Sequence, residues 1–64
     1  MTRIDTISII SAAEQVAFVL TAHGGYLVTP VPNATVDQLE DVNIIARVQS
    51  LDDAVARFRR MYGL

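Results

Sequence analysis

The chain has 64 residues with no cysteine and one histidine, which excludes disulfides, thiolate-bound metals and a multi-histidine site within one chain. Its net charge is −2 and all five basic residues are arginines, so the basic surplus of most nucleic-acid-binding proteins is absent. The hydrophobic fraction of 52% excludes a disordered chain, and no apolar run approaches the roughly 20 residues that cross a membrane.

The small size makes subunit association an expectation. We expect a single domain over residues 1–64. The core of so short a domain seldom supplies more than about 3–5 kcal/mol of stability. Because disulfides and thiolate metal sites are excluded, either association or unusually good packing must compensate. We therefore expect a homodimer.

The first element in chain order is a strand over residues 3–10. This stretch is rich in β-branched isoleucine and threonine, which favour strands. Ile9 and Ile10 fall on opposite faces, so the alternation is imperfect. Either both faces of the strand are covered or the strand ends at Ile9.

Residues 12–23 are predicted to form a helix, mainly on the strength of its ends. Ser11 and Glu14 have the spacing of a capping box, in which serine accepts from an N–H of the first turn. Gly24 and Gly25 follow where a helix would stop. The alternative is a strand over residues 15–22.

The alternative strand has its own support in the sequence. Val16, Phe18 and Leu20 would share one face of a strand, and His23-Gly24-Gly25 would form a hairpin turn. In the favoured helix, by contrast, Phe18 lies opposite the apolar stripe, on the side of Glu14 and Thr21.

Three weaker elements follow. Residues 26–31 are predicted to form a strand that Pro30 either ends or confines to an edge. Residues 35–41 are predicted to make a short helical turn. Apolar residues recur at every second position of residues 42–49, from Val42 to Val48, and would share one face of a strand. This alternation predicts a half-buried strand.

The last element, over residues 51–62, has the clearest helical pattern. Its apolar residues recur at helical spacing, and Ser50 with Asp53 forms a second capping box. Gly63 follows as the stop signal. The chain therefore predicts an α+β fold, with a small single-layer sheet of about three strands and two helices packed on one face, in β-α-β-β-α order. The strand alternative for residues 15–22 gives ββββα.

Phe18 is the leading candidate for a partner-binding residue. An aromatic ring on the outer side of a helix needs a cover, which a second subunit or another protein would supply. Glu14, Thr21 and Ala22 would flank the ring. The charged rim would come from the arginine cluster of the last helix, which consists of Arg57, Arg59 and Arg60.

No catalytic, cofactor-binding or metal-binding residue is predicted. His23 has no second ligand at metal spacing, and a helix-terminal role explains it better. Asp37, Glu40 and Asp41 form an acidic cluster that we interpret as a solvated turn or a docking patch, because no calcium-loop spacing accompanies it.

These patterns predict a small non-enzymatic regulator or inhibitor that binds another protein and masks its site sterically, with a size and composition that suit a bacterial or bacteriophage protein. The N-terminus resembles no signal peptide, so we expect a cytoplasmic location without membrane contact. The alternative is a dimeric nucleic-acid-binding transcriptional regulator that uses the arginine helix. An enzyme with a shared site around His23 ranks last.

Overall fold

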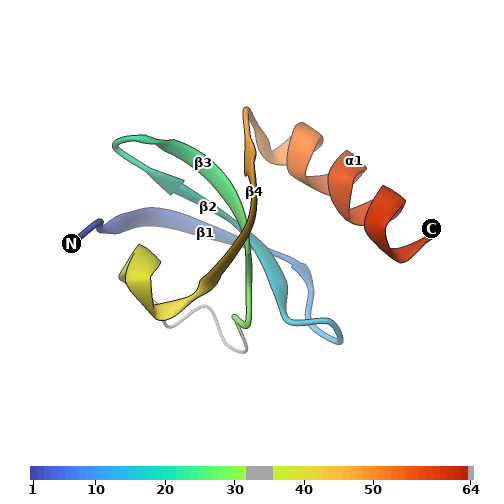
Figure 1. Ribbon diagram of the computed structural model, residues 1–64, viewed down its shortest axis with the longest axis horizontal. Coiled ribbons are helices and arrows are strands. Elements are labelled where there is room, and N and C mark those ends of the chain that lie inside the picture. The colour runs from blue at the N-terminus through green and yellow to red at the C-terminus, as the bar shows by residue number, and fades with distance from the viewer. Residues whose placement is uncertain (32–35, 64) are drawn as a thin grey trace.

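The structure is a computed structural model that describes residues 1–31 and 36–63. Four antiparallel strands lie side by side in chain order, and one helix follows them (Figure 1). The strands are β1 (Ile4–Ser11), β2 (Val16–Thr21), β3 (Gly24–Thr29) and β4 (Asn43–Val48). A single 3-10 turn, η1 (Leu39–Asp41), precedes β4, and the helix α1 (Leu51–Tyr62) ends the fold.

The predicted fold of three strands and two helices is wrong, and the alternative ββββα order is confirmed. The predicted helix over residues 12–23 is instead strand β2 and the turns on either side of it. Strand β2 pairs with β1 along one edge and with β3 along the other, and each of its faces packs into a separate apolar cluster, so residues 16–19 are all buried. An apolar stretch buried on both faces has no polar stripe, and helical and strand patterns then become hard to distinguish.

The first capping signal is real but belongs to a turn. The Glu14 N–H donates to Ser11 Oγ at 3.2 Å, as it would at a helix start. The chain then reverses, with Gln15 in the left-handed region at φ 58°. The Gln15 carbonyl accepts from the Val31 N–H at 2.9 Å. This hydrogen bond joins the turn before β2 to the residues that follow β3.

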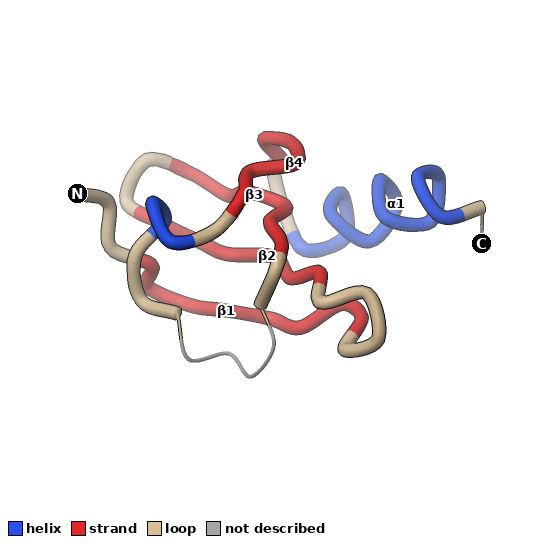
Figure 2. Tube along the Cα trace, turned by 60° about the horizontal axis from the view of Figure 1, so that its bottom comes forward, coloured by secondary structure: helices blue, strands red, loops and turns tan. Residues whose placement is uncertain are grey.

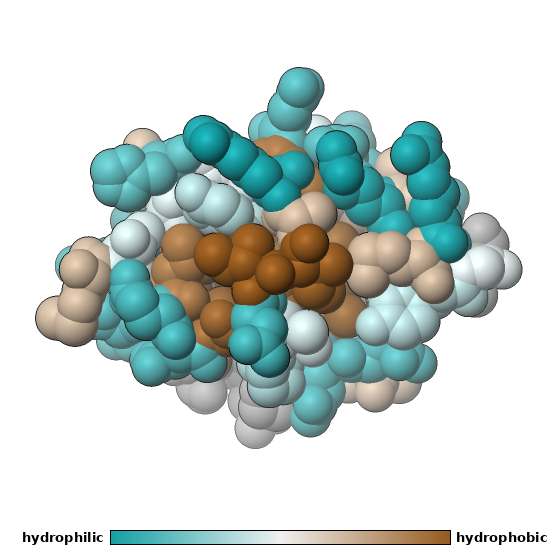
Figure 3. All heavy atoms as spheres, viewed as in Figure 1, coloured by the Kyte–Doolittle hydropathy of each residue, from teal (hydrophilic) through white to brown (hydrophobic). Residues whose placement is uncertain are grey.

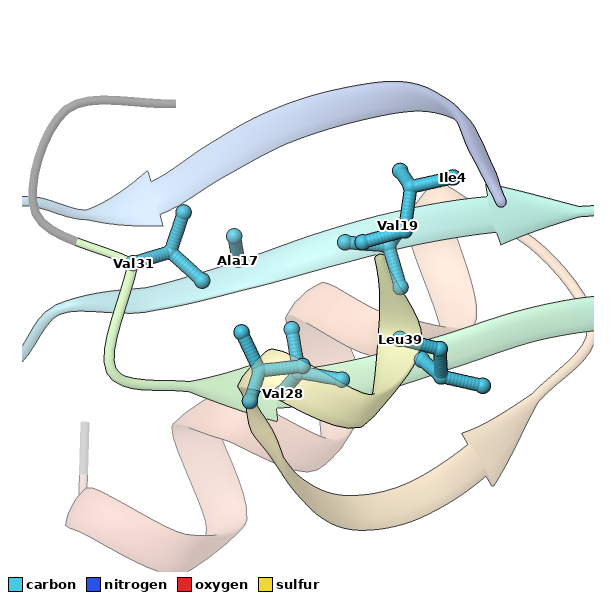
Figure 4. Packing of buried hydrophobic residues seen from close by; sticks show 7 residues of the cluster. Ile4, Ala17, Val19, Val28, Val31 and Leu39 are labelled. Carbon is cyan, nitrogen blue, oxygen red and sulfur yellow. The ribbon is translucent and has the colours of Figure 1, made fainter. Parts of the chain in front are cut away.

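Each face of the sheet carries its own core. The loop-side core lies under the segment that joins β3 to β4 and is drawn in Figure 4; its buried members are Ile4, Ala17, Val19, Val28, Val31, Leu39 and Val42. The helix-side core lies between the sheet and α1, and its buried members are Val16, Phe18, Leu27, Val48, Ala54 and Phe58. Adjacent β2 residues alternate between the two cores, as strand geometry requires.

The helix has the bounds that the sequence predicts. Ser50 Oγ accepts from the Asp53 N–H at 3.2 Å, and Asp53 Oδ2 accepts in return from the Gln49 N–H at 3.1 Å. Gly63 closes the helix in the left-handed conformation at φ 70°, and its N–H donates to the Arg59 carbonyl. Seen from a second direction, α1 extends past the end of the sheet (Figure 2).

The alternation predicted for residues 42–49 breaks at a β-bulge. Successive partners across β3 and β4 skip Ile45, which lies between Ile44 and Ala46. Val42 therefore belongs to the loop-side core and Val48 to the helix-side core. Ile44 is 50% exposed. In the view of Figure 1, β4 crosses the middle of the molecule, and the space-filling picture from the same side shows hydrophobic side chains gathered there (Figure 3).

The remaining predicted elements shift at their ends. Strand β3 ends at Thr29, directly before Pro30, and lies inside the sheet. Of the predicted turn over residues 35–41, the structure shows the 3-10 turn at Leu39–Asp41, while Thr35 lies outside the described residues.

The start of β1 is covered by the chain that leads into η1. The Ile4 N–H donates to the Asp37 carbonyl at 2.9 Å, and the Leu39 N–H donates to the Thr2 carbonyl at 2.8 Å. These bonds occupy the outer edge of β1 over its first residues. From residue 5 to residue 11, the outer edge pairs with no other described segment.

A candidate binding groove between β1 and α1

A groove of about 370 Å³ lies between the outer strand β1 and the helix α1. Strand β1 contributes Ser8, Ile9 and Ile10 to its lining, and α1 contributes Leu51, Val55, Phe58 and Arg59. The walls are therefore mainly aliphatic and aromatic, while the Ser8 hydroxyl and the Arg59 guanidinium are polar.

The packing of α1 explains why the groove exists. Ala54 and Phe58 are buried in the helix-side core and fix the helix against the sheet. Val55 and Leu51 lie on the flank of the helix that lines the groove, where β1 is the last strand and no further strand fills the space. Leu51 is 43% exposed, so the groove presents apolar surface to solvent.

The backbone edge beside this groove pairs with no other described segment, and the register of β1 against β2 is irregular at Asp5 and at Ile10. Residues 6–11 read Thr-Ile-Ser-Ile-Ile-Ser, without a charge, a proline or a glycine. Natural proteins usually block an exposed edge strand with such residues, because its free N–H and C=O groups pair readily with another strand. An apolar groove and a strand edge open to pairing thus lie side by side.

The last turn of α1 extends the apolar surface. The Tyr62 ring packs on the Phe58 ring, with centroids 4.7 Å apart and planes tilted by 36°. Met61 and Tyr62 are both largely exposed.

The structure places the predicted partner-binding residues apart. Phe18 is 8% exposed and belongs to the helix-side core, so α1 of the same chain supplies the cover for which a second subunit was expected. Thr21 is buried and closes the β2–β3 hairpin: its hydroxyl donates to the Gly24 carbonyl and accepts from the His23 N–H. Glu14 and Ala22 are exposed, in the turns at opposite ends of β2.

The three arginines of α1 have different surroundings. Arg57 Nε lies 3.6 Å from Asp53 Oδ2, in an ion pair along the helix. Arg59 lines the groove and Arg60 is exposed. Arg47, on β4, donates from Nη2 to the His23 carbonyl at 3.0 Å. The residues predicted for one interface therefore reach the candidate groove only through Arg59.

His23 and the acidic cluster have structural partners. His23 lies in the β2–β3 hairpin turn. The role predicted for it at the end of a helix is therefore wrong, because no helix forms there. Glu40 Oε1 accepts from the Thr2 N–H at 2.6 Å, and this backbone hydrogen bond holds the pKa of Glu40 below its ordinary value of 4.5. Over residues 1–31 and 36–63, no three His, Asp or Glu side chains gather as a metal site would require.

Sequence reasoning missed the groove because it forms between segments distant in the chain. The available signal was the pair Ile9 and Ile10, which alternation could not place on one face. Together with the uncharged run over residues 6–11, that pair indicates a strand whose apolar side chains are not all buried by its own sheet.

Comparisons with protein-family models, with curated proteins and with solved structures found no match to this chain. No helix among the described residues is long and apolar enough to cross a membrane.

Proposed function

We propose that this protein is a small binding module that acts on another protein sterically, without chemistry of its own. It would receive an extended segment of a partner along the outer edge of β1, and the groove between β1 and α1 would take the side chains. The observation that carries the proposal is the uncharged stretch of the β1 edge over residues 6–11, beside an apolar groove that the described residues leave open.

Strand addition suits both parts of this surface. An extended peptide that joins a sheet edge gains affinity from main-chain hydrogen bonds, and pockets for alternate side chains give it specificity. The free edge supplies the hydrogen bonds from residue 5 onward. Leu51, Val55 and Phe58 supply apolar walls that would accept aliphatic or aromatic side chains.

The nucleic-acid alternative stays a prediction without a supporting observation. One of the three helix arginines that it would need, Arg57, already pairs with Asp53. The net charge of −2 gives no counterion-releasing surplus.

The test is selection of binding peptides from a random displayed library against the immobilised protein. We expect selected peptides with alternating apolar residues and no internal proline. Amide chemical shifts of the labelled protein should then change along β1 and along the first two turns of α1.

Two lysine variants locate the site. Leu51→Lys should abolish peptide binding, and Leu20→Lys should preserve it, since Leu20 is 42% exposed against 43% for Leu51 but lies outside the groove lining. Circular dichroism would establish that both variants fold. Peptides that map to β4 or to the β2–β3 hairpin, equal losses in both variants, or a selection against the monomeric chain that yields no binders would contradict the proposal.

A further inference from the structure

We infer that the occupant of the groove is a second copy of this chain, joined by antiparallel pairing of the two β1 strands around a twofold axis near Ser8. This inference rests on the proposed function, because it uses the same edge and the same groove. It adds the identity of the partner and the register of the pairing.

The register follows from what the chain itself covers. Hydrogen bonds to residues 37–39 occupy the outer edge of β1 up to Ile4, so the free edge runs from Asp5 to Ser11, with irregular register against β2 at Asp5 and at Ile10 and a regular stretch between them. The centre of that run is Ser8. A twofold axis there places Ser8 opposite the partner's Ser8 and Ile7 opposite the partner's Ile9.

The same axis brings the two grooves together. A twofold axis perpendicular to a sheet keeps each face of the sheet on its own side, so both helices lie on one face of the joined sheet. Each groove adjoins β1 and therefore borders the seam. Leu51 and Val55 of both copies then face a shared apolar space, which removes exposed surface from water.

The charges along β1 are complementary in the antiparallel direction. Arg3 and Asp5 lie at its start, while Glu14 follows its end and Arg59 lines the groove beside Ile9 and Ile10. Reversal of one strand brings Asp5 towards the partner's Arg59 and Arg3 towards the partner's Glu14. Parallel pairing would instead oppose like charges, which disfavours it.

The other edge of the sheet is less suited to pairing. Strand β4 has 6 residues against 8 in β1, and its charged Arg47 lies within the strand, whereas the charged Asp5 lies at the start of β1 and leaves residues 6–11 uncharged.

The sharpest test is a single cysteine at the axis, since the native chain has none. Opposed residues of antiparallel strands have Cα atoms about 4.5–5.5 Å apart, within the range that a disulfide spans. Ser8→Cys should therefore become a covalent dimer with oxidised glutathione at low micromolar concentration. Ala22→Cys, exposed in the β2–β3 hairpin, should stay monomeric under the same conditions.

Sedimentation equilibrium of the full chain provides the second test. We expect a dimer whose dissociation constant rises at least about tenfold in Ile9→Lys, because two lysines then enter the seam. Ile44→Lys, the matched change on β4, should leave it unchanged. Asp5→Arg and Arg59→Asp should each weaken the dimer, and the double variant should restore it.

The outcomes separate this inference from the proposed function. A monomer at about 100 µM, equal cross-linking in both cysteine variants, or dissociation by Ile44→Lys alone would overturn the dimer. If that monomer still binds selected peptides at β1, the binding function stands and only the identity of the occupant is wrong. If it binds none, both fail.

Discussion

The same four-residue signal occurs twice in this chain and begins two different structures. In both copies a serine hydroxyl accepts from the N–H of an acid three residues later, at 3.2 Å. After Ser50 the chain continues into a helix of 12 residues, whereas after Ser11 it turns back into a strand. The local hydrogen bond is therefore compatible with both structures.

The difference lies in the residues that follow each serine. After Ser50, apolar residues recur at helical spacing, so one helix face meets the sheet and the other meets solvent. After Ser11, apolar residues fill nearly every position of β2, which lies between two cores. The second acid also accepts from the Gln49 N–H, a bond that Glu14 lacks among the described contacts. The burial of the following residues therefore determines whether a helix or a strand forms, which the capping hydrogen bond alone does not.

The largest expected effect tests the position of Phe18. Phe18→Ala should lower the free energy of unfolding by about 3–5 kcal/mol, as Phe58→Ala should, because both rings fill the helix-side core. That loss matches the whole stability expected of so small a core, so both variants should be largely unfolded without urea. Leu20→Ala, an exposed position on the same strand, should cost less than about 0.5 kcal/mol. Urea unfolding of the three variants measures this. Equal losses for Phe18 and Leu20 would place Phe18 on the surface, as the helix prediction did.

Gly25 tests how tightly β2 packs on β3. A Cβ at Gly25 would lie 2.6 Å from Phe18 Cε1 and 3.1 Å from the Val48 carbonyl oxygen. Gly25→Ala should therefore cost about 1–3 kcal/mol, as overpacking does. In a Phe18→Leu background the ring atoms are gone, and the cost measured by urea unfolding should fall by roughly half. An unchanged cost would mean that Phe18 does not lie over Gly25.

The two serines provide the direct comparison. Ser50→Ala should cost about 1 kcal/mol, since it removes the N-cap of α1. Ser11→Ala should cost about 0.5 kcal/mol or less, because the bond closes an exposed turn. Far-ultraviolet circular dichroism should show loss of helical signal only for Ser50→Ala. A larger loss from Ser11→Ala would mean that a helix begins there.

The smallest effect concerns pH. The Thr2 N–H lowers the pKa of Glu40, so folding favours the charged carboxylate. Its contribution to stability should be complete above the ordinary pKa of 4.5 and should disappear as the pH falls through the lower folded value. Urea midpoints of the native chain and Glu40→Gln should therefore differ at neutral pH and converge in acid. Asp41→Asn is the matched control, and convergence of that variant alone would contradict the assignment.

The sequence contained enough to predict α1 but not to choose the state of residues 15–22. The helix has one apolar stripe, so its periodicity and its caps agree. Strand β2 has no polar face, so the capping signals at its ends favour a helix while its burial on both faces favours a strand. The groove escaped prediction for another reason: Ile9 and Val55 are far apart in the chain, and only the strand order brings them together.

The pairing of the N-terminus with residues 37–39 has a consequence for folding during synthesis. The three strands β1, β2 and β3 are joined by short turns, so each can pair with its predecessor as it leaves the ribosome. The hydrogen bond from Thr2 to Glu40, by contrast, joins residues 38 apart in the chain. A nascent chain that ends before residue 37 therefore carries the outer edge of β1 uncovered along its whole length, and the addition of residues 37–39 shortens the exposed edge to the part from Asp5 onward.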